Sequence, residues 1–265
     1  METQTPKALT QPPRLHCLLQ IALPMILSQA TETIMMFVDR IFLSIIGKEA
    51  LSATMTGGLS VFVFSSFFSG LVGYVNAIVA QYNCANRLNR CIKATFQALW
   101  LSIFFYPLTL ALIPFVNQSF HWAGHSLTQI SLESTYFQIL MFGTIIYMFR
   151  QALVGYFLGQ GRTRIVLIAN ITGMLLNIPL NYILIFGKLG FFALGITGAA
   201  YGTLCGGFAV FTVLLIYFLK NKVFKEYSGT GRWKIRKDLM LRLIKFGWPA
   251  GMELFLTVFA FNIFI

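Results

Sequence analysis

The sequence predicts an all-α protein that crosses a membrane several times. Of its 265 residues, 57% are hydrophobic and only 11% are charged, and 27 of them are phenylalanine. A water-soluble domain of this size could not cover so much apolar surface with polar groups. Apolar segments long enough to span a hydrocarbon layer of about 30 Å recur along the whole chain, which indicates a polytopic helical membrane protein.

Seven such segments follow one another, and each is expected to form a membrane-spanning helix. The segments between them are polar or rich in glycine, which favours turns and interrupts helices. Residues 47–49 form the first tight turn, residues 83–89 and 159–164 form polar loops, and residues 187–195 form a short hairpin. The seven expected helices are residues 15–46, 51–83, 93–117, 131–157, 165–187, 195–219 and 239–265.

The net charge of +12 does not indicate a nucleic-acid partner, because the basic residues gather in alternate loops. Sixteen of the 20 Lys and Arg residues lie in the N-terminal tail or in and beside every second loop after it. Cytoplasmic loops of membrane proteins carry such an excess of Lys and Arg. We therefore expect the N-terminus and the 220–238 loop to lie in the cytoplasm.

The basic loop also divides the chain into unequal parts. Residues 1–14 are expected to form a cytoplasmic tail, residues 15–219 a six-helix transmembrane bundle, and residues 220–238 a basic cytoplasmic linker. Residues 239–265 then form a single further helix. This organisation predicts one bundle and the beginning of another.

The last segment repeats the beginning of the first. Each copy begins as an amphipathic helix with an aliphatic pair, then carries a proline, Pro24 or Pro249, and continues as a long apolar run. Repeats of about six helices are frequent in secondary transporters, whose binding sites lie between the repeats. Because Ile265 ends an apolar run without a polar tail, we expect the chain to be truncated after the first helix of a second bundle.

Two acidic residues in the first expected helix are the strongest indication of function. A charged Asp at the centre of a membrane helix costs roughly 2.5–3.5 kcal/mol, so Asp39 is expected to face protein or water and to handle an ion, a proton or a cationic ligand. Glu32 precedes it by seven residues, which places the two carboxyl groups within about 20° of each other on the helix and roughly 10 Å apart along its axis. An acidic face on a membrane helix favours a transport function.

Cysteine and histidine give little support for a metal site. Four cysteines show no metal-ligand spacing, and we interpret them as small apolar residues. His121 and His125 have the i,i+4 spacing of metal ligands, but no third ligand lies nearby in the sequence, so we interpret them as loop residues. No cofactor is expected.

Four motifs in order resemble the bacterial form of the multidrug and toxic compound extrusion (MATE) family. Residues 22–40 read A-L-P-M through F-V-D-R, and residues 70–81 read G-L-V-G through A-Q. Residues 158–163 read L-G-Q-G-R-T, and residues 177–182 read N-I-P-L-N-Y. The resemblance runs through nearly the whole chain and implies the N-terminal lobe of a twelve-helix, two-lobe transporter of the MOP flippase superfamily.

The resemblance implies a cation site in this lobe, formed by Asp39 together with Asn177 and Asn181. It also implies H⁺ or Na⁺ as the coupling ion and small organic cations as cargo. The residues themselves agree, because Asn170, Asn177 and Asn181 follow a spacing of seven and four and form one stripe of a helix. Amides in such a stripe can coordinate Na⁺ or hold a carboxyl group, although Asn170 and Asn181 can also serve as contacts between helices.

Two positions depart from the family pattern. Arg40 stands where a Thr is usual, and we interpret it as a side chain that reaches the membrane interface. Thr257 stands where several members carry an acid in the seventh helix, and Glu253 precedes it by one turn. Glu32 is the first-helix counterpart of Thr257, so Glu32 and Glu253 are alternative replacements for that acid; Glu253 can also simply pair with Lys245 or water.

We therefore expect a cation-coupled antiporter that exports organic compounds across the inner membrane of a bacterium. A complementary C-terminal lobe is an expected partner besides the lipid bilayer. Alternatives are a flippase for lipid-linked precursors, which would display basic residues in its cavity, and a non-functional fragment. An intramembrane enzyme is not expected, because the apolar segments contain no nucleophile with its base and no cluster of metal ligands.

Overall fold

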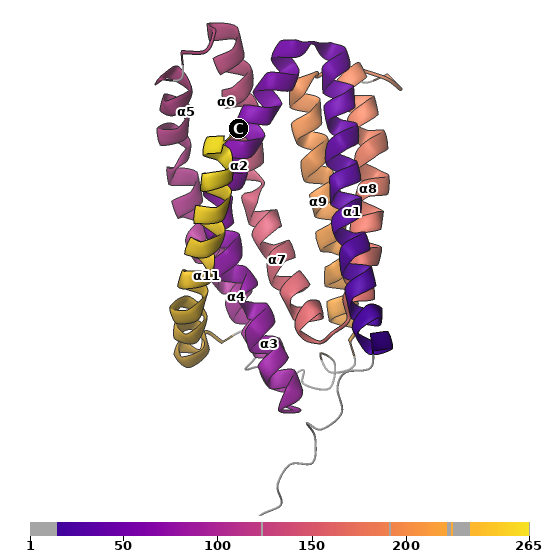
Figure 1. The fold of residues 1–265 in the computed structure, drawn as a ribbon, viewed down its shortest axis with the longest axis vertical. Helices are drawn as coiled ribbons and strands as arrows, with labels where there is room; N and C mark the ends of the chain where they lie inside the picture. Colours follow the sequence, from indigo (N-terminus) through magenta and orange to yellow (C-terminus); the bar gives the residue numbers. More distant parts are fainter. Residues whose placement is uncertain (1–14, 123, 191, 222–223, 225–233, 265) are drawn as a thin grey trace, which may run out of the picture.

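The computed structural model describes residues 15–122, 124–190, 192–221, 224 and 234–264. Within these residues the chain consists of helices joined by short turns (Figure 1). The predicted tail 1–14 and most of the predicted linker 220–238 lie outside the described residues. The helices are α1 (Leu15–Ile46), α2 (Lys48–Gly73), α3 (Val75–Cys84), α4 (Leu88–Ala111), α5 (Ile113–Trp122), α6 (Leu127–Phe142), α7 (Thr144–Gly159), α8 (Thr163–Phe186), α9 (Ile196–Lys220) and α11 (Lys237–Phe264).

The seven predicted membrane spans appear in the predicted order. Helices α1, α8, α9 and α11 are each long and apolar enough to cross a membrane, and so are the continuous pairs α2–α3 and α4–α5. The pair α6–α7 makes a seventh span if the two helices are counted together, with a bend of 46° between them. The structure thus confirms an all-α arrangement of six to seven apolar spans.

The prediction of the fourth helix, residues 131–157, is wrong in two details. It begins earlier, at Leu127, because the Ser126 side chain accepts a hydrogen bond from the Gln129 backbone and caps the helix. It is also bent at Gly143, where a β-carbon would lie 1.9 Å from a methyl group of Leu204 in α9. The Tyr106 hydroxyl donates a hydrogen bond to the Phe142 carbonyl beside the bend. The bend turns α7 toward the centre of the bundle.

Helices α1, α8 and α9 form one side of the molecule, while α2, α4, α6 and α11 lie on the other side (Figure 1). The largest apolar core joins α3, α4, α7 and α9, and its fully buried side chains include Tyr156, Phe157 and Phe218. Helix α11 packs on α2 through glycines: a β-carbon at Gly251 would lie 2.5 Å from the Phe67 carbonyl oxygen. The predicted first helix of a second bundle therefore packs directly against the first bundle.

The basic loops share one end of the bundle, as predicted from their alternation. The start of α1, the α3–α4 and α7–α8 turns, the end of α9 and the start of α11 all lie at the lower end in Figure 1. The α1–α2 turn with Lys48 and the α8–α9 turn with Lys188 lie at the upper end. The compartment that the basic end faces stays a prediction.

Helices α8 and α9 approach each other closely through small residues. A β-carbon at Gly206 would lie 2.8 Å from the β-carbon of Asn177, and one at Gly173 would lie 2.3 Å from a methyl group of Val210. In membrane proteins such small residues allow backbones to approach, because packing rather than a hydrophobic driving force joins the helices. This packing holds the face of α8 that carries Asn177 and Asn181 inside the bundle.

We expect Gly206→Ala to destabilise the protein by about 1–3 kcal/mol, because the added methyl group overpacks the α8–α9 interface against Asn177. Gly207→Ala is the matched control, since nothing lies within 4 Å of a β-carbon at that position. Thermal unfolding of both variants in detergent tests this. Equal melting temperatures for the two variants would contradict the packing argument.

Candidate functional site

The candidate site lies where α1 faces α8. The Asn181 amide donates a hydrogen bond to Oδ1 of Asp39 over 2.5 Å, and the same amide lies 3.3 Å from Oδ1 of Asn177. Both asparagines are fully buried, whereas Asp39 is half-buried. The structure therefore brings together Asp39, Asn177 and Asn181, three of the four residues predicted to bind the cation. The fourth, Glu32, contacts Arg150 and Asn170 instead.

Two polar atoms at this site have no hydrogen-bond partner among the described residues, although they are buried. They are Nδ2 of Asn177 and Oδ1 of Asn181. Buried polar groups are normally hydrogen-bonded, so unpaired ones suggest a role in binding. The free amide oxygen of Asn181 and the carboxylate of Asp39 are both oxygen ligands suited to Na⁺.

Two further polar side chains stand near Asp39, and sequence reasoning did not find them. Tyr136 of α6 is close enough to Asp39 to interact with it electrostatically, and it hydrogen-bonds the side chain of Thr203 from α9. Tyr136 also packs against Leu43 and Ile185. No sequence signal distinguishes these residues, because a single Tyr or Thr in an apolar helix most often serves packing.

Glu32, seven residues before Asp39 on α1, has a separate set of partners on α7 and α8. Its Oε1 accepts hydrogen bonds from the Arg150 guanidinium over 3.2 Å and from the Asn170 amide over 3.3 Å. The Asn170 amide also donates to the Ser28 hydroxyl over 2.8 Å. Glu32 and Asp39 thus face the same neighbour, α8, but bind different asparagines.

Arg150, the cationic partner of Glu32, is a residue to which the sequence alone assigned no role. Its guanidinium lies 5.1 Å from the centre of the Tyr147 ring, which adds a cation–π contact to the ion pair. The Arg150 side chain is 14% exposed and that of Glu32 is 36% exposed. Tyr147 and Arg150 follow the bend at Gly143 in α7, and Arg150 reaches Glu32 from there.

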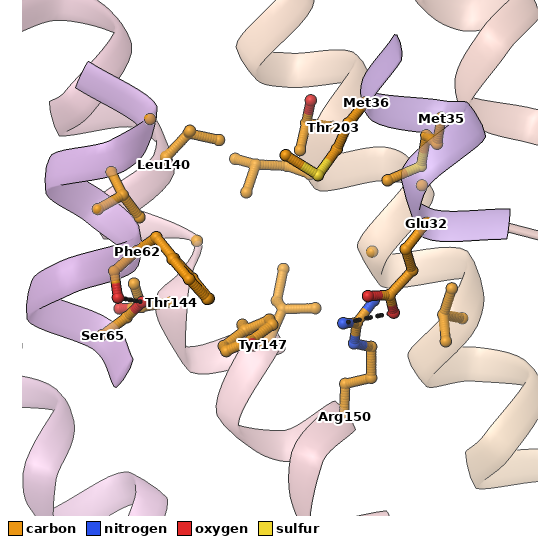
Figure 2. Close-up of a pocket in the computed structure, with 18 of the residues that line it drawn as sticks. Glu32, Met35, Met36, Phe62, Ser65, Leu140, Thr144, Tyr147, Arg150 and Thr203 are labelled. Carbon is orange, nitrogen blue, oxygen red and sulfur yellow. Dashed lines mark hydrogen bonds and ion pairs between the residues drawn. The ribbon is translucent and has the colours of Figure 1, made fainter. Parts of the chain in front are cut away.

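A cavity of about 300 Å³ opens beside this ion pair. Figure 2 shows Glu32 and Arg150 together on one side of it, with Phe62 and Ser65 of α2 on the opposite side. Most of its other walls are apolar, and Met35, Met36, Leu140 and Tyr147 are among them. Thr203 also lines the cavity, which connects it to the neighbourhood of Asp39. An apolar cavity with a few convergent polar groups suits an amphipathic organic ligand.

The remaining predicted residues lie away from these contacts. Arg40 is exposed on α1, and its reach to the membrane interface stays a prediction. Glu253 and Thr257 are exposed on α11, where the Thr257 hydroxyl donates to the Glu253 carbonyl oxygen over 2.8 Å. Among the described contacts there is no ion pair between Glu253 and Lys245. Their assignment to substrate or coupling stays a prediction.

The two histidines take no part in this site. His125 lies 3.0 Å from Oε2 of Glu133, a fully buried carboxyl group that also accepts a hydrogen bond from Gln129. The interpretation of His125 as an ordinary loop residue is therefore incomplete, since it partners a buried acid. No group of three or more potential metal ligands occurs within the described ranges.

Comparison with known proteins places this arrangement among membrane transporters. The model of the MatE family matches residues 24–183, which is more than half of the chain. The chain is 29% identical over 238 residues to a probable multidrug resistance protein NorM of Synechocystis sp., covering 88% of this chain and 51% of that protein. It is 27% identical over 250 residues to the multidrug resistance protein MdtK of Photorhabdus laumondii subsp. laumondii, covering 93% and 54%.

Solved structures show the same fold. The eukaryotic MATE transporter AtDTX14 superimposes with a TM-score of 0.81 at 22% identity, covering 94% of this chain and 55% of that one. An outward-facing MATE transporter of the MOP superfamily gives a TM-score of 0.77 at 22% identity, covering 89% and 52%. The chain thus spans about half the length of the proteins it matches.

We expect Glu32 and Arg150 to stabilise the lobe as a pair. Glu32→Gln or Arg150→Met alone should each lower the free energy of unfolding by about 1–3 kcal/mol, because each leaves a partly buried charge without its partner. The double variant should lose less than the sum of the two single variants. Denaturation of the four proteins measures this coupling.

Additive losses in that cycle would show that the two side chains act independently. The pair Glu49→Gln and Lys48→Met is a suitable control, since both residues are exposed in the first turn of α2 and their replacement should change stability little.

Proposed function

Because the chain belongs to the MatE family of transporters, we propose that it forms the N-terminal lobe of a cation-coupled antiporter for organic compounds. Relatives over nearly the whole chain are named multidrug resistance proteins, which supports efflux as the activity. The observation that carries the proposal is the Asp39 carboxyl group, held by the buried amide of Asn181 inside a membrane span. Transport by the whole protein would then need both halves of the fold.

In this proposal Asp39 binds the coupling cation, either H⁺ or Na⁺. A carboxylate inside a membrane is costly unless it is neutralised, so cation binding and the position of α1 are energetically linked. Asn181 donates its amide nitrogen to Asp39 and to the Asn177 oxygen, and a rotation of the Asn181 amide would turn its oxygen toward Asp39 to share a Na⁺ ion. Na⁺ would thus be held by residues of α1 and α8 alone, with no other cofactor.

Loss or gain of the cation would shift α1 relative to α8. Pro24 lies inside α1 and Pro179 inside α8, and a proline removes one backbone hydrogen bond from a helix and allows it to bend. Pro179 sits between Asn177 and Asn181, so a bend there would change the spacing of the two amides around Asp39. In this way the binding of a small cation would change the shape of the cavity.

The cavity beside Glu32 is the proposed place for the cargo. Its apolar walls suit the hydrophobic part of an organic compound, and Glu32 supplies a carboxylate for a cationic group. In the absence of cargo, Glu32 instead forms its ion pair with Arg150. Small organic cations are therefore the proposed cargo.

The alternative of a lipid-linked precursor flippase is less well supported by the cavity. A pyrophosphate group would need several unpaired cations, whereas Arg150 is the one Lys or Arg among the described lining residues, and Glu32 neutralises it. The proposal also places the protein in the inner membrane of a bacterium, with the basic end of the bundle and the N-terminus in the cytoplasm.

We expect Asp39→Asn to lower ethidium efflux from energised vesicles at least tenfold, because the amide cannot bind and release the coupling cation. The measurement uses this chain joined to the C-terminal half of a MatE relative, and it is run in parallel on the chain alone. Glu49→Gln is the matched control, since Glu49 is an exposed acid in the first turn of α2.

Undiminished, ion-dependent efflux by the Asp39→Asn variant would exclude the proposed role of Asp39. Efflux by the chain alone would show that a second lobe is not needed. If the joined protein does not move ethidium at all, the flippase and the non-functional fragment become the better explanations.

A further inference from the structure

Cationic side chains from two distant segments meet at the basic end of the bundle. Arg90 and Lys93 belong to the first turns of α4, and Arg236 and Arg242 lie just before and within the start of α11. Lys93 is close enough to both Arg90 and Arg236 to interact with them electrostatically. We call these four residues the basic cluster.

A buried glutamine holds the α11 segment against α4. The Gln97 side chain is fully buried, donates a hydrogen bond to the Lys234 carbonyl oxygen over 3.1 Å, and accepts one from the Arg236 backbone over 3.0 Å. An amide that satisfies two backbone groups in this way fixes the position of the segment. The approach of Arg236 to α4 is therefore built into the fold.

The ring of Tyr82, at the end of α3, joins the two arginines. The Arg90 guanidinium lies 5.6 Å from the centre of this ring and the Arg242 guanidinium 5.9 Å from it. Arg242 is held further by hydrogen bonds to the Gln81 side chain over 2.7 Å and to the Tyr82 hydroxyl over 3.4 Å. Both cations are thus positioned, but by neutral partners.

No acid neutralises the cluster in the described part of the chain. The ion pairs there involve Glu32 and Glu133, which belong to other regions, and the nearest acid in sequence is the exposed Asp238. Four cations held close together repel one another unless an anion binds among them. The arrangement therefore favours the binding of an anionic ligand.

The surface next to the cluster is apolar. Leu241, Trp248 and Met252 are 65%, 50% and 39% exposed and form one stripe along α11, although the Trp248 ring also packs edge-on against Phe67 of α2. A ligand that contacts both the cluster and this stripe must carry a negative headgroup and a hydrophobic tail. At the end of a membrane-spanning helix, an anionic lipid has this chemistry.

We propose that the basic cluster binds the phosphate headgroup of an anionic phospholipid, whose acyl chains lie along the exposed stripe of α11. Such a lipid bridges α3 and α4 to α11. It would thereby stabilise the packing of α11 on the rest of the bundle.

The test is lipid binding by the purified full chain in mild detergent, measured by native mass spectrometry and by the shift in melting temperature. Phosphatidylglycerol is titrated against phosphatidylcholine. We expect phosphatidylglycerol to remain bound and to raise the melting temperature, and phosphatidylcholine to do neither. Arg90→Gln/Arg242→Gln should weaken the apparent affinity for phosphatidylglycerol at least tenfold.

Arg162→Gln/Arg164→Gln is the matched control, because it removes two cations from the same end of the bundle, one just before α8 and one in its first turn. This control should bind within twofold of the unchanged chain, and Arg90→Lys/Arg242→Lys should retain binding if charge is what matters. Equal losses in the two glutamine variants would overturn the site, since any basic residue at this end would then suffice. A stabilisation by inorganic phosphate equal to that by phosphatidylglycerol would overturn the lipid as the occupant.

Discussion

A polar side chain inside a membrane must find a partner within the protein, and this constraint governs the interface of α1 with α8. Helix α1 carries two carboxyl groups, and α8 offers an asparagine to each: Asn181 donates to Asp39 and Asn170 donates to Glu32. The second carboxyl group also binds Arg150, whereas the first has no cation of its own among the contacts described. This difference is why we propose Asp39 as the place for the coupling cation, whereas Glu32 is neutralised by Arg150 until cargo binds.

The rest of the lobe serves to hold these partners in place. Glycines let α9 approach α8 so closely that Asn177 and Asn181 are fully buried, and Gly143 lets Leu204 approach the break between α6 and α7. That break directs α7 toward α1. A cavity remains between these helices, with charges on one wall and apolar side chains on the others (Figure 2). The proposed cation site and the cavity therefore share α1, α8 and α9, so that a movement of α1 would change both.

The membrane spans, their order and the asparagine stripe of α8 could be predicted from the sequence, because hydropathy and helical spacing are properties of single segments. The roles of Arg150 and Tyr136 could not be predicted, because they depend on how α6 and α7 pack against α1. The bend at Gly143 was missed for the same reason, since only the approach of Leu204 reveals why glycine is required there. Glu253 and Thr257 were chosen through the family resemblance, and the described structure leaves them on the exposed surface of α11.

The central claim is that Asp39 and the asparagines of α8 hold the coupling cation. Its most direct test is cation binding to the purified chain, with Na⁺ followed by calorimetry and H⁺ followed by a pH indicator. The account predicts saturable binding of one of these cations, its loss in Asp39→Asn, and its persistence in Glu49→Gln. Equal binding by the unchanged chain and the Asp39→Asn variant would contradict the account.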